Sequence, residues 1–316
     1  GGPPLRSAAE TRRQVRDVWA WNFEEEFAAF LLATALPCTG GCGVVLALDT
    51  EFPGFVCDTH PAQAPSACYR ALRENVDLLW PIQIGVAVAD GNGVLLGVWS
   101  FNMRFDAATD KHSETSVEFL RAAGIDFARH RSEGILANDL GRRLLGSHLV
   151  GPQGHTACWV TFSGLYDMGY LMKLLTSGRP LPSDATAFER LMSMYCPRRR
   201  DLRDLLPTGS LDTLGRRHGV KRHGAAHTAG SDALLTLDLF FHASTFEGGT
   251  KCWDVNDWGP WARDNRAFFW GPGYAFDDGW ASQKWANAWH WAAAASAASM
   301  SVALAQSRSS SFFLPL

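Results

Sequence analysis

Four acidic residues and one histidine occupy positions from which a folded sheet with flanking helices could gather them at one point. They are Asp49, Glu51, Asp167, His227 and Asp232. Carboxylate oxygens are the ligands that hard divalent cations take in proteins. Two such cations, about 3.5–4 Å apart, can hold the attacking and leaving oxygens of a phosphodiester during in-line displacement. These residue types therefore predict metal-dependent removal of nucleotides from an RNA end.

Each of these residues also has an ordinary interpretation when it is taken alone. Asp49 suits a turn at a strand end, and an aspartate near a helix start, such as Asp167 or Asp232, commonly caps free backbone donors. His227 alone suits a surface position. Burying a carboxylate is costly unless a metal or hydrogen bonds compensate its charge. An apolar strand that runs directly into Asp49 and Glu51 therefore favours a functional site.

The first two acids follow a short apolar run, Val44-Val45-Leu46-Ala47-Leu48. Such a run predicts a strand that is buried on both faces. Alternate residues of an extended chain point to the same side. Asp49 and Glu51 are therefore expected to share one face of the sheet, and Thr50 is expected to point away from them.

The remaining elements follow from apolar periodicity and turn signals. Further strands are expected over residues 82–89, 94–101 and 158–162, with a short one at Asp201 and Leu202. Helices are expected over residues 116–124, 134–145, 166–175, 211–218 and 229–241. The segment Asp90-Gly91-Asn92-Gly93 predicts a hairpin turn. Strands alternating with helices predict an α/β fold in which helices flank a mixed central β-sheet.

The two ends of the chain differ in character from its middle. Residues 1–11 carry Gly, Pro and scattered charge, which predicts a loose N-terminus. Apolar residues from Val15 to Leu31 recur at helical spacing, so an amphipathic helix is expected there, ending near Pro37. One folded domain is expected over residues 12–245. Residues 246–316 form a Trp-rich tail, which holds eight of the thirteen tryptophans and shows no helical or strand period.

Composition narrows the class of protein. The chain has 316 residues, of which 47% are hydrophobic and 19% charged, as in a globular protein. Its net charge of −3 argues against a nonspecific polycation but not against a nuclease, whose acids contribute negative charge themselves. Seven cysteines, odd in number and irregularly spaced, suit reduced thiols. With no apolar signal-peptide core and no membrane-length apolar run, an intracellular protein without a membrane partner is expected.

Two other groups of residues allow a functional and an ordinary interpretation. Zinc-ligand types occur at Cys38, Cys42, Cys57 and His60, but their spacing is loose and the first strand separates them, so unrelated residues are favoured. Basic residues suit either an RNA-backbone track or ordinary solvated surface, and the latter is favoured. These basic residues are Arg198, Arg199, Arg200, Arg203, Arg216, Arg217, Lys221 and Arg222.

Taken together, the motifs resemble those of the Caf-one/Pop-two family, the poly(A) ribonuclease subunit of the Ccr–Not deadenylase complex, within the DEDD exonuclease superfamily. The resemblance covers roughly residues 11–243. Its most specific segments are Asp49-Thr50-Glu51-Phe52-Pro53-Gly54, Tyr166-Asp167-Met168-Gly169-Tyr170-Leu171 and the block from His227 to Asp232. Met168 replaces a usual phenylalanine, Trp80 replaces a usual polar or basic residue, and the Trp-rich tail matches nothing in the family.

The resemblance implies a ribonuclease-H-like exonuclease fold, with the exonuclease domain over residues 12–245. It implies that Asp49 bridges two divalent ions, Mg²⁺ or Mn²⁺, that Glu51 and Asp232 complete one site, and that Asp167 helps to hold the other. His227 would be the general base, since an imidazole titrates near neutral pH.

The implied activity is 3′-to-5′ shortening of poly(A) tails with release of AMP. The implied partners are poly(A) RNA and the scaffold and second nuclease subunit of the Ccr–Not complex, in cytoplasm and nucleus. Two alternatives stay open. One is a noncatalytic docking module of the deadenylase complex. The other is a related exonuclease that acts on DNA or other nucleic acid ends.

Overall fold

The computed structural model describes residues 8–35, 43–57, 65–207 and 209–246. The first seven residues and the Trp-rich tail, apart from Phe246, lie outside this part of the chain. Within the expected loose N-terminus, the described residues form a short helix, α1 (Ala8–Arg12). Its sequence, Ala-Ala-Glu-Thr-Arg, contains good helix formers, which explains the difference from expectation.

A single mixed sheet of six strands forms the centre of the fold, in the order β1-β4-β3-β2-β5-β6. β3 pairs antiparallel with both β2 and β4, whereas β1–β4, β2–β5 and β5–β6 are parallel pairs. The mixed sheet confirms the expected fold class. The strands are β1 (Val15–Val18), β2 (Val44–Glu51), β3 (Gln83–Ala89), β4 (Leu95–Asn102), β5 (Ala157–Thr161) and β6 (Arg199–Asp201).

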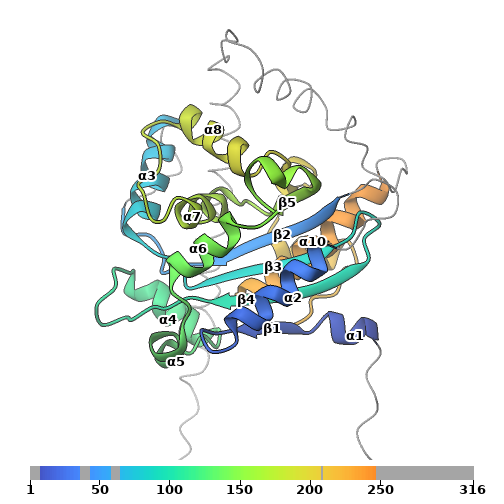
Figure 1. Ribbon diagram of the computed structural model, residues 1–316, viewed down its shortest axis with the longest axis horizontal. Coiled ribbons are helices and arrows are strands. Elements are labelled where there is room, and N and C mark those ends of the chain that lie inside the picture. The colour runs from blue at the N-terminus through green and yellow to red at the C-terminus, as the bar shows by residue number, and fades with distance from the viewer. Residues whose placement is uncertain (1–7, 36–42, 58–64, 208, 247–316) are drawn as a thin grey trace, which may run out of the picture.

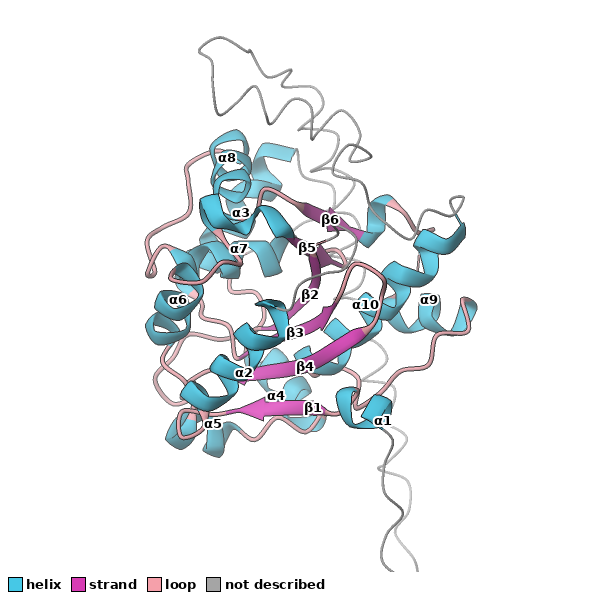
Figure 2. Cartoon of the chain, turned by 45° about the vertical axis from the view of Figure 1, so that its right-hand side comes forward, coloured by secondary structure: helices cyan, strands magenta, loops and turns pink. Residues whose placement is uncertain are grey.

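Helices cover both faces of the sheet (Figures 1 and 2). On one face lie α9 (Leu211–Arg217) and α10 (Ala229–Phe246). The other face carries α2 (Phe23–Ala35), α3 (Pro65–Leu78), α6 (Ala137–Leu145), α7 (Leu165–Leu175) and α8 (Ala185–Tyr195). The shorter elements are α4 (Glu114–Ala122), α5 (Phe127–Glu133), η1 (Gly151–Thr156) and η2 (Leu202–Asp204). Within the described residues, no helix combines the length and apolar character needed to cross a bilayer.

The first half of β2 divides its side chains between two hydrophobic cores. Leu46 and Leu48 belong to the core that contains α7. Val45 and Ala47 belong to the core that contains α10. Because side chains alternate along a strand, Asp49 and Glu51 continue the α10 side. Thr50 continues the α7 side.

The expected helix from Val15 to Leu31 is wrong in its first half. Val15–Val18 is strand β1, paired with Val98–Phe101 of β4, and the helix α2 starts only at Phe23. Val15 and Val18, three positions apart, suit a helix face, but β-branched residues also favour strands. Pairing with the edge of β4 selects the strand. The Asn22 side chain closes the turn between the two elements. Its Oδ1 accepts the Trp19 N–H at 2.7 Å, and its Nδ2 donates to the Asp17 carbonyl at 3.1 Å.

Helix α3 had not been predicted from the sequence. Its C-terminal end is hydrogen-bonded by a buried lysine of α7. Lys173 is 2% exposed, and its Nζ donates to the carbonyl oxygens of Val76 at 2.8 Å, Asp77 at 3.1 Å and Leu79 at 2.8 Å. These are carbonyls that a helix end leaves without intrahelical partners. The Trp80 ring lies 4.1 Å from the same ammonium, which is a cation–π geometry and explains an aromatic residue at this position.

Candidate active site

Three of the expected acids meet at the end of β2. Carboxylate oxygens of Asp49, Glu51 and Asp232 lie within 4.8 Å of one another. Asp49 and Glu51 reach this point from alternate positions of β2, and Asp232 reaches it from the first turn of α10. The shared face expected for Asp49 and Glu51 is therefore observed.

A glycine opposite Asp49 lets α10 come this close to the strands. Gly85 of β3 pairs with Asp49, and a Cβ atom on Gly85 would lie 2.0 Å from the Ala229 carbonyl oxygen. Any side chain at Gly85 would therefore push away the start of α10 and, with it, Asp232. Gln83 fixes the same helix end, because its Oε1 accepts the Ala229 N–H at 3.3 Å.

The fourth acid, Asp167, approaches from α7 on the other side of the strand. It is not one of the three acids whose oxygens lie within 4.8 Å of one another. Thr50 points toward α7, and its hydroxyl donates to Asp167 Oδ1 at 2.5 Å. Thr50, which was expected only to point away from the carboxylates on β2, is thus the residue that connects β2 to Asp167.

Burial and mutual repulsion make these carboxyls hard to ionise. Burial, followed by the charges of Asp232 and Asp167, raises the pKa values of Asp49 and Glu51 well above the ordinary range. Burial raises the pKa of Asp167 to about 7, against the hydrogen bond from Thr50. Burial also raises the pKa of Asp232, against the nearby Arg222.

The donor set fits divalent cations. All four side chains offer oxygen atoms, which Mg²⁺ and Mn²⁺ take as ligands. Burial and mutual repulsion raise the pKa values of Asp49 and Glu51, and the nearby Arg222 offsets this only in part, so bound cations would further stabilise the ionised carboxylates. The residues are therefore suited to hold metal ions between β2, α7 and α10.

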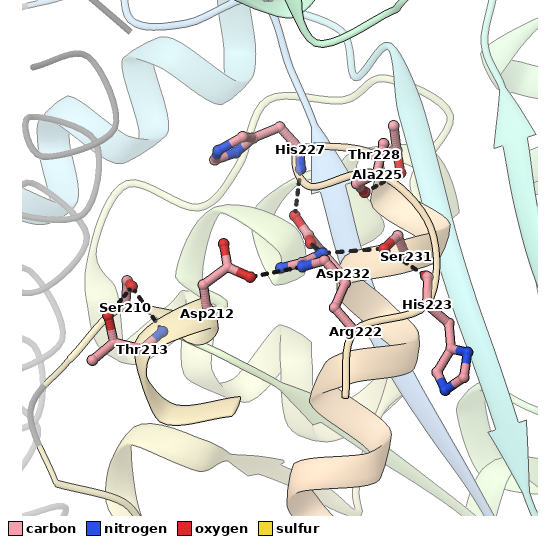
Figure 3. Close-up of polar contacts among 10 residues, drawn as sticks. All are labelled: Ser210, Asp212, Thr213, Arg222, His223, Ala225, His227, Thr228, Ser231 and Asp232. Atoms are coloured by element: carbon pink, nitrogen blue, oxygen red, sulfur yellow. Dashed lines mark hydrogen bonds and ion pairs between the residues drawn. The ribbon is translucent and has the colours of Figure 1, made fainter. Parts of the chain in front are cut away.

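Arg222 is a residue of the site that sequence reasoning had not placed there. Its Nη1 contacts Asp232 Oδ1 and donates to Ser231 Oγ at 3.1 Å, and its Nε donates to Asp212 Oδ1 at 2.7 Å (Figure 3). The interpretation of Arg222 as a solvated surface residue is thus wrong, because its guanidinium contacts two carboxylates and its side chain is only 17% exposed, whereas a contact of Arg222 with RNA stays a prediction. No signal in the segment Lys221-Arg222-His223 distinguishes it from the other basic residues.

His227 is attached to the cluster by its backbone. Its N–H donates to Asp232 Oδ2 at 3.2 Å, with the imidazole directed elsewhere (Figure 3). The residue has φ = +60°, a left-handed conformation that histidine adopts more readily than most residues. The imidazole packs against the Phe119 ring of α4 at 4.8 Å and 70°. Backbone and side chain are therefore held by different elements.

Comparison with known proteins places this arrangement in a family. The family model described as CAF1 family ribonuclease matches residues 44–139. The probable CCR4-associated factor 1 homolog 10 of Arabidopsis thaliana is 38% identical over 253 residues, which cover 73% of this chain and 87% of that protein. The chain belongs to the CAF1 ribonuclease family. The resemblance stated from the motifs is thereby confirmed.

Other members of the CAF1 family show the same relationship in sequence and structure. Poly(A) ribonuclease pop2 of Schizosaccharomyces pombe is 35% identical, over 72% of this chain and 68% of that protein. The structure of S. pombe Pop2p in its Mg²⁺- and Mn²⁺-bound form superposes with a TM-score of 0.68 and 32% identity, over 77% of this chain and 96% of that one. The structure of the yeast NOT1 MIF4G domain co-crystallised with CAF1 superposes with a TM-score of 0.62 and 27% sequence identity. The match covers 78% of this chain and 93% of that one. The expected ribonuclease-H-like exonuclease fold is confirmed.

The second group of candidate ligands in this CAF1-family chain, the cysteines and histidine of zinc-ligand type, is not tested. Of the four residues with zinc-ligand types, only Cys57 lies in the described part of the chain. Cys38, Cys42 and His60 lie outside it.

Two other residues of the basic group considered for an RNA-backbone track also make contacts within the fold. Arg199 pairs with Glu189, and Arg203 Nε donates to Ser163 Oγ at 2.7 Å.

Proposed function

We propose that this chain is a metal-dependent 3′-to-5′ exoribonuclease that shortens poly(A) tails and releases AMP. The observation that supports this most strongly is the meeting of Asp49, Glu51 and Asp232 within 4.8 Å, in a fold shared with Pop2p in its Mg²⁺- and Mn²⁺-bound form. Its relative, poly(A) ribonuclease pop2, carries the corresponding activity in its name.

Each residue then has a role set by its position. Glu51 and Asp232 would hold one ion together with Asp49. Asp49 would reach the second ion as well, which Asp167 approaches from α7. Bound divalent cations would neutralise the charge that develops on the phosphate and orient the oxygens that attack and leave. The imidazole of His227 would accept the proton of the attacking water, as a general base does.

Arg222 has a different role from these ligands, because it touches an acid and not the reacting atoms. Its guanidinium is held by Asp212 and Ser231 and contacts Asp232 Oδ1. It would keep Asp232 oriented toward Asp49 and Glu51 and offset part of the negative charge of the cluster.

We also propose that the chain works within a Ccr–Not type assembly, on the scaffold and beside the second nuclease. This is supported by a relative named as a CCR4-associated factor and by CAF1 crystallised with the NOT1 MIF4G domain. Activity in cytoplasm and nucleus is a further proposal. It suits Cys57, Cys68, Cys158 and Cys196, none of which forms a disulfide among the described residues. Imaging of the tagged chain in cells tests that placement.

The decisive experiment uses 5′-labelled RNA that ends in a run of adenosines. Purified protein is incubated with Mg²⁺ or Mn²⁺, beside an EDTA control, the Asp49→Asn variant and a DNA oligonucleotide of the same sequence. A ladder that shortens from the 3′ end only in the wild-type metal reactions with RNA is expected. Binding of Mn²⁺ without shortening would support a noncatalytic docking module instead. Equal shortening of DNA would support an exonuclease of broader substrate class.

A further inference from the structure

The turn that leads into α7 is held by a residue from another strand and not by a capping side chain of its own. The helix is preceded by Gly164, which offers no side chain to the free N–H groups of the first turn. A Cβ atom on Gly164 would lie 2.1 Å from Thr161 Cβ, so a capping side chain cannot be placed there. Ser163, just before it, is left-handed with φ = +58°, a costly conformation for a residue other than glycine.

Asp201, at the end of β6, accepts from the two backbone N–H groups that lie just before the helix. Its Oδ1 accepts the Ser163 N–H at 2.9 Å, and its Oδ2 accepts the Gly164 N–H at 2.8 Å. The Thr161 hydroxyl also donates to Oδ2, at 3.3 Å. One carboxylate from a different strand therefore bonds the last residue of β5 and two residues of the segment between β5 and α7.

Arg203 holds the same turn from its side-chain face. Its backbone N–H donates to Asp201 Oδ1 at 2.9 Å, and its Nε donates to Ser163 Oγ at 2.7 Å. Its guanidinium carbon lies 4.2 Å from the centre of the Phe162 ring. Asp201 and Arg203 together form a clamp, which we name the 201–203 clamp.

The clamped turn lies three residues before a metal ligand. Asp167 follows Gly164 within the first turn of α7, where a shift of the helix start moves its carboxylate directly. On its other side, the carboxylate contacts the Thr50 hydroxyl. Asp167 is thus fixed between β2 and a turn whose geometry depends on Asp201.

We propose that Asp201 is a positioning residue that sets the Asp167 carboxylate for metal binding by clamping the turn between β5 and α7. The proposal rests on the function proposed above for Asp167 and adds a residue that belongs to none of the recognised motifs. Asp201 is not among the proposed metal ligands. Its effect reaches the site through the backbone of Ser163 and Gly164.

The test replaces Asp201 by Asn and measures Mn²⁺ binding by isothermal titration calorimetry, which needs no RNA and no turnover. Asparagine keeps the size of the side chain but replaces one carboxylate oxygen by an NH₂ group. That NH₂ group would face a backbone N–H, and two donors cannot form a hydrogen bond with each other. Loss of outer partners of metal ligands commonly costs about 10–100-fold in metal affinity. We expect the Mn²⁺ dissociation constant and the half-saturating Mn²⁺ for RNA shortening to rise by that factor. Saturating Mn²⁺ should restore kcat, and KM for RNA should stay unchanged.

Asp184→Asn is the matched control. Asp184 is also a capping aspartate, whose side chain accepts the Ala187 N–H at 2.8 Å at the start of α8, but it is exposed and caps a different helix. Its replacement should leave Mn²⁺ binding unchanged. If Asp201→Asn lowered activity equally at every Mn²⁺ concentration, or left the dissociation constant unchanged, the proposal would be overturned. The wild-type RNA assay separately reports whether the proposed function itself fails.

A second variant separates positioning from simple charge and decides the matter if Asp201→Asn does not fold. Arg203→Met keeps the Asp201 carboxylate and the backbone N–H that bonds it, but removes the bond to Ser163 Oγ. Positioning predicts weaker Mn²⁺ binding in this variant. Charge attraction alone predicts tighter binding, because a nearby cation is lost. Tighter or unchanged binding in Arg203→Met would overturn the proposal.

Discussion

At the residue scale, Asp49 illustrates a conflict between stability and activity. Burial and the neighbouring acids oppose its ionisation, so the metal-free fold holds a destabilising cluster. Asp49→Asn removes one of these carboxyls. We expect RNA shortening to fall by about 10²–10³-fold or more, since charge stabilisation at the reacting phosphate is lost.

The same substitution should stabilise the metal-free protein. A gain on the order of 1 kcal/mol corresponds to about 2–4 °C in Tm for a domain of this size. Differential scanning calorimetry in EDTA checks this. Asp139→Asn is the control, since Asp139 lies outside the acidic cluster and pairs with Arg142 on α6. A lower Tm for Asp49→Asn would show that the cluster is not repulsive.

His227 supports a second prediction at this scale. His227→Asn removes the imidazole but keeps the backbone N–H that bonds Asp232, and asparagine tolerates the left-handed conformation. Removal of a general base predicts a kcat lower by roughly 10²–10⁴-fold, with Mn²⁺ affinity unchanged. Single-turnover RNA kinetics and calorimetry measure the two quantities.

His223→Gln is the control for that experiment. The contact that His223 makes with the site is its carbonyl oxygen, which accepts from Ser231 Oγ at 2.8 Å and survives the substitution. Its kcat should match the wild type. An equal loss in both variants, or a loss of Mn²⁺ affinity in His227→Asn, would contradict the base assignment.

The sequence predicted the contacts of some side chains of the site but not of others. The pairing of Asp49 and Glu51 follows from the period of a strand, which is a local property. The contact of Arg222 with Asp232 depends on how the loop between α9 and α10 folds back, which no local pattern encodes. Thr50 was given the correct direction, but its partner was unknown because Asp167 is 117 positions away.

At the element scale, the end of α3 depends on one lysine of α7. Burial lowers the pKa of Lys173 to about 8, so the ammonium persists at neutral pH and donates to three carbonyls. Lys173→Met would leave these acceptors without that donor. We expect a loss on the order of 3 kcal/mol in the free energy of unfolding.

Urea denaturation measures this loss, with Arg179→Met as control because Arg179 is exposed near the end of the same helix. The control should stay within about 0.5 kcal/mol of wild type. A similar small change in Lys173→Met would show that water replaces the ammonium at the helix end.

The elements that the sequence analysis misplaced or missed differ in the reason. Strand β1 exists because β4 offers it an edge, and Val15 and Val18 satisfy both a helix and a strand pattern. Helices α3 and α8 were missed although both carry buried apolar residues at helical spacing, Tyr69, Leu72 and Val76 in α3 and Phe188 and Met192 in α8. Lys173, which an amphipathic pattern would place on the surface, is buried against α3. Strands β2, β3 and β5 were predicted because they are buried on both faces and read as continuous apolar runs.

At the scale of the whole molecule, the acids link stability to pH and metal. A carboxyl whose folded pKa is raised contributes stability that is present in full below its unfolded value, 3.8 for aspartate, and is lost as pH rises through the folded value, about 7 for Asp167. Without metal, Tm should therefore fall between about pH 5 and about pH 8.

Mn²⁺ should reverse this loss, and more strongly at the higher pH, because its ligands must be deprotonated. Metal at about 100 times its dissociation constant adds about 2.7 kcal/mol, or roughly 5–10 °C. Thermal melts with Mn²⁺ and with EDTA at about pH 6 and about pH 8 test the linkage. An equal metal effect at both values would disprove it.

The acids of the site are separated by 183 positions between Asp49 and Asp232, although their oxygens meet within 4.8 Å. A ribosome therefore makes the strand with Asp49 and Glu51 long before it makes α10. Until that helix has left the exit tunnel and packed on β2 and β3, a nascent chain lacks one of its ligands. Such a chain remains inert toward the adenosine tail of the message being translated, so synthesis itself delays the appearance of activity until the domain is complete.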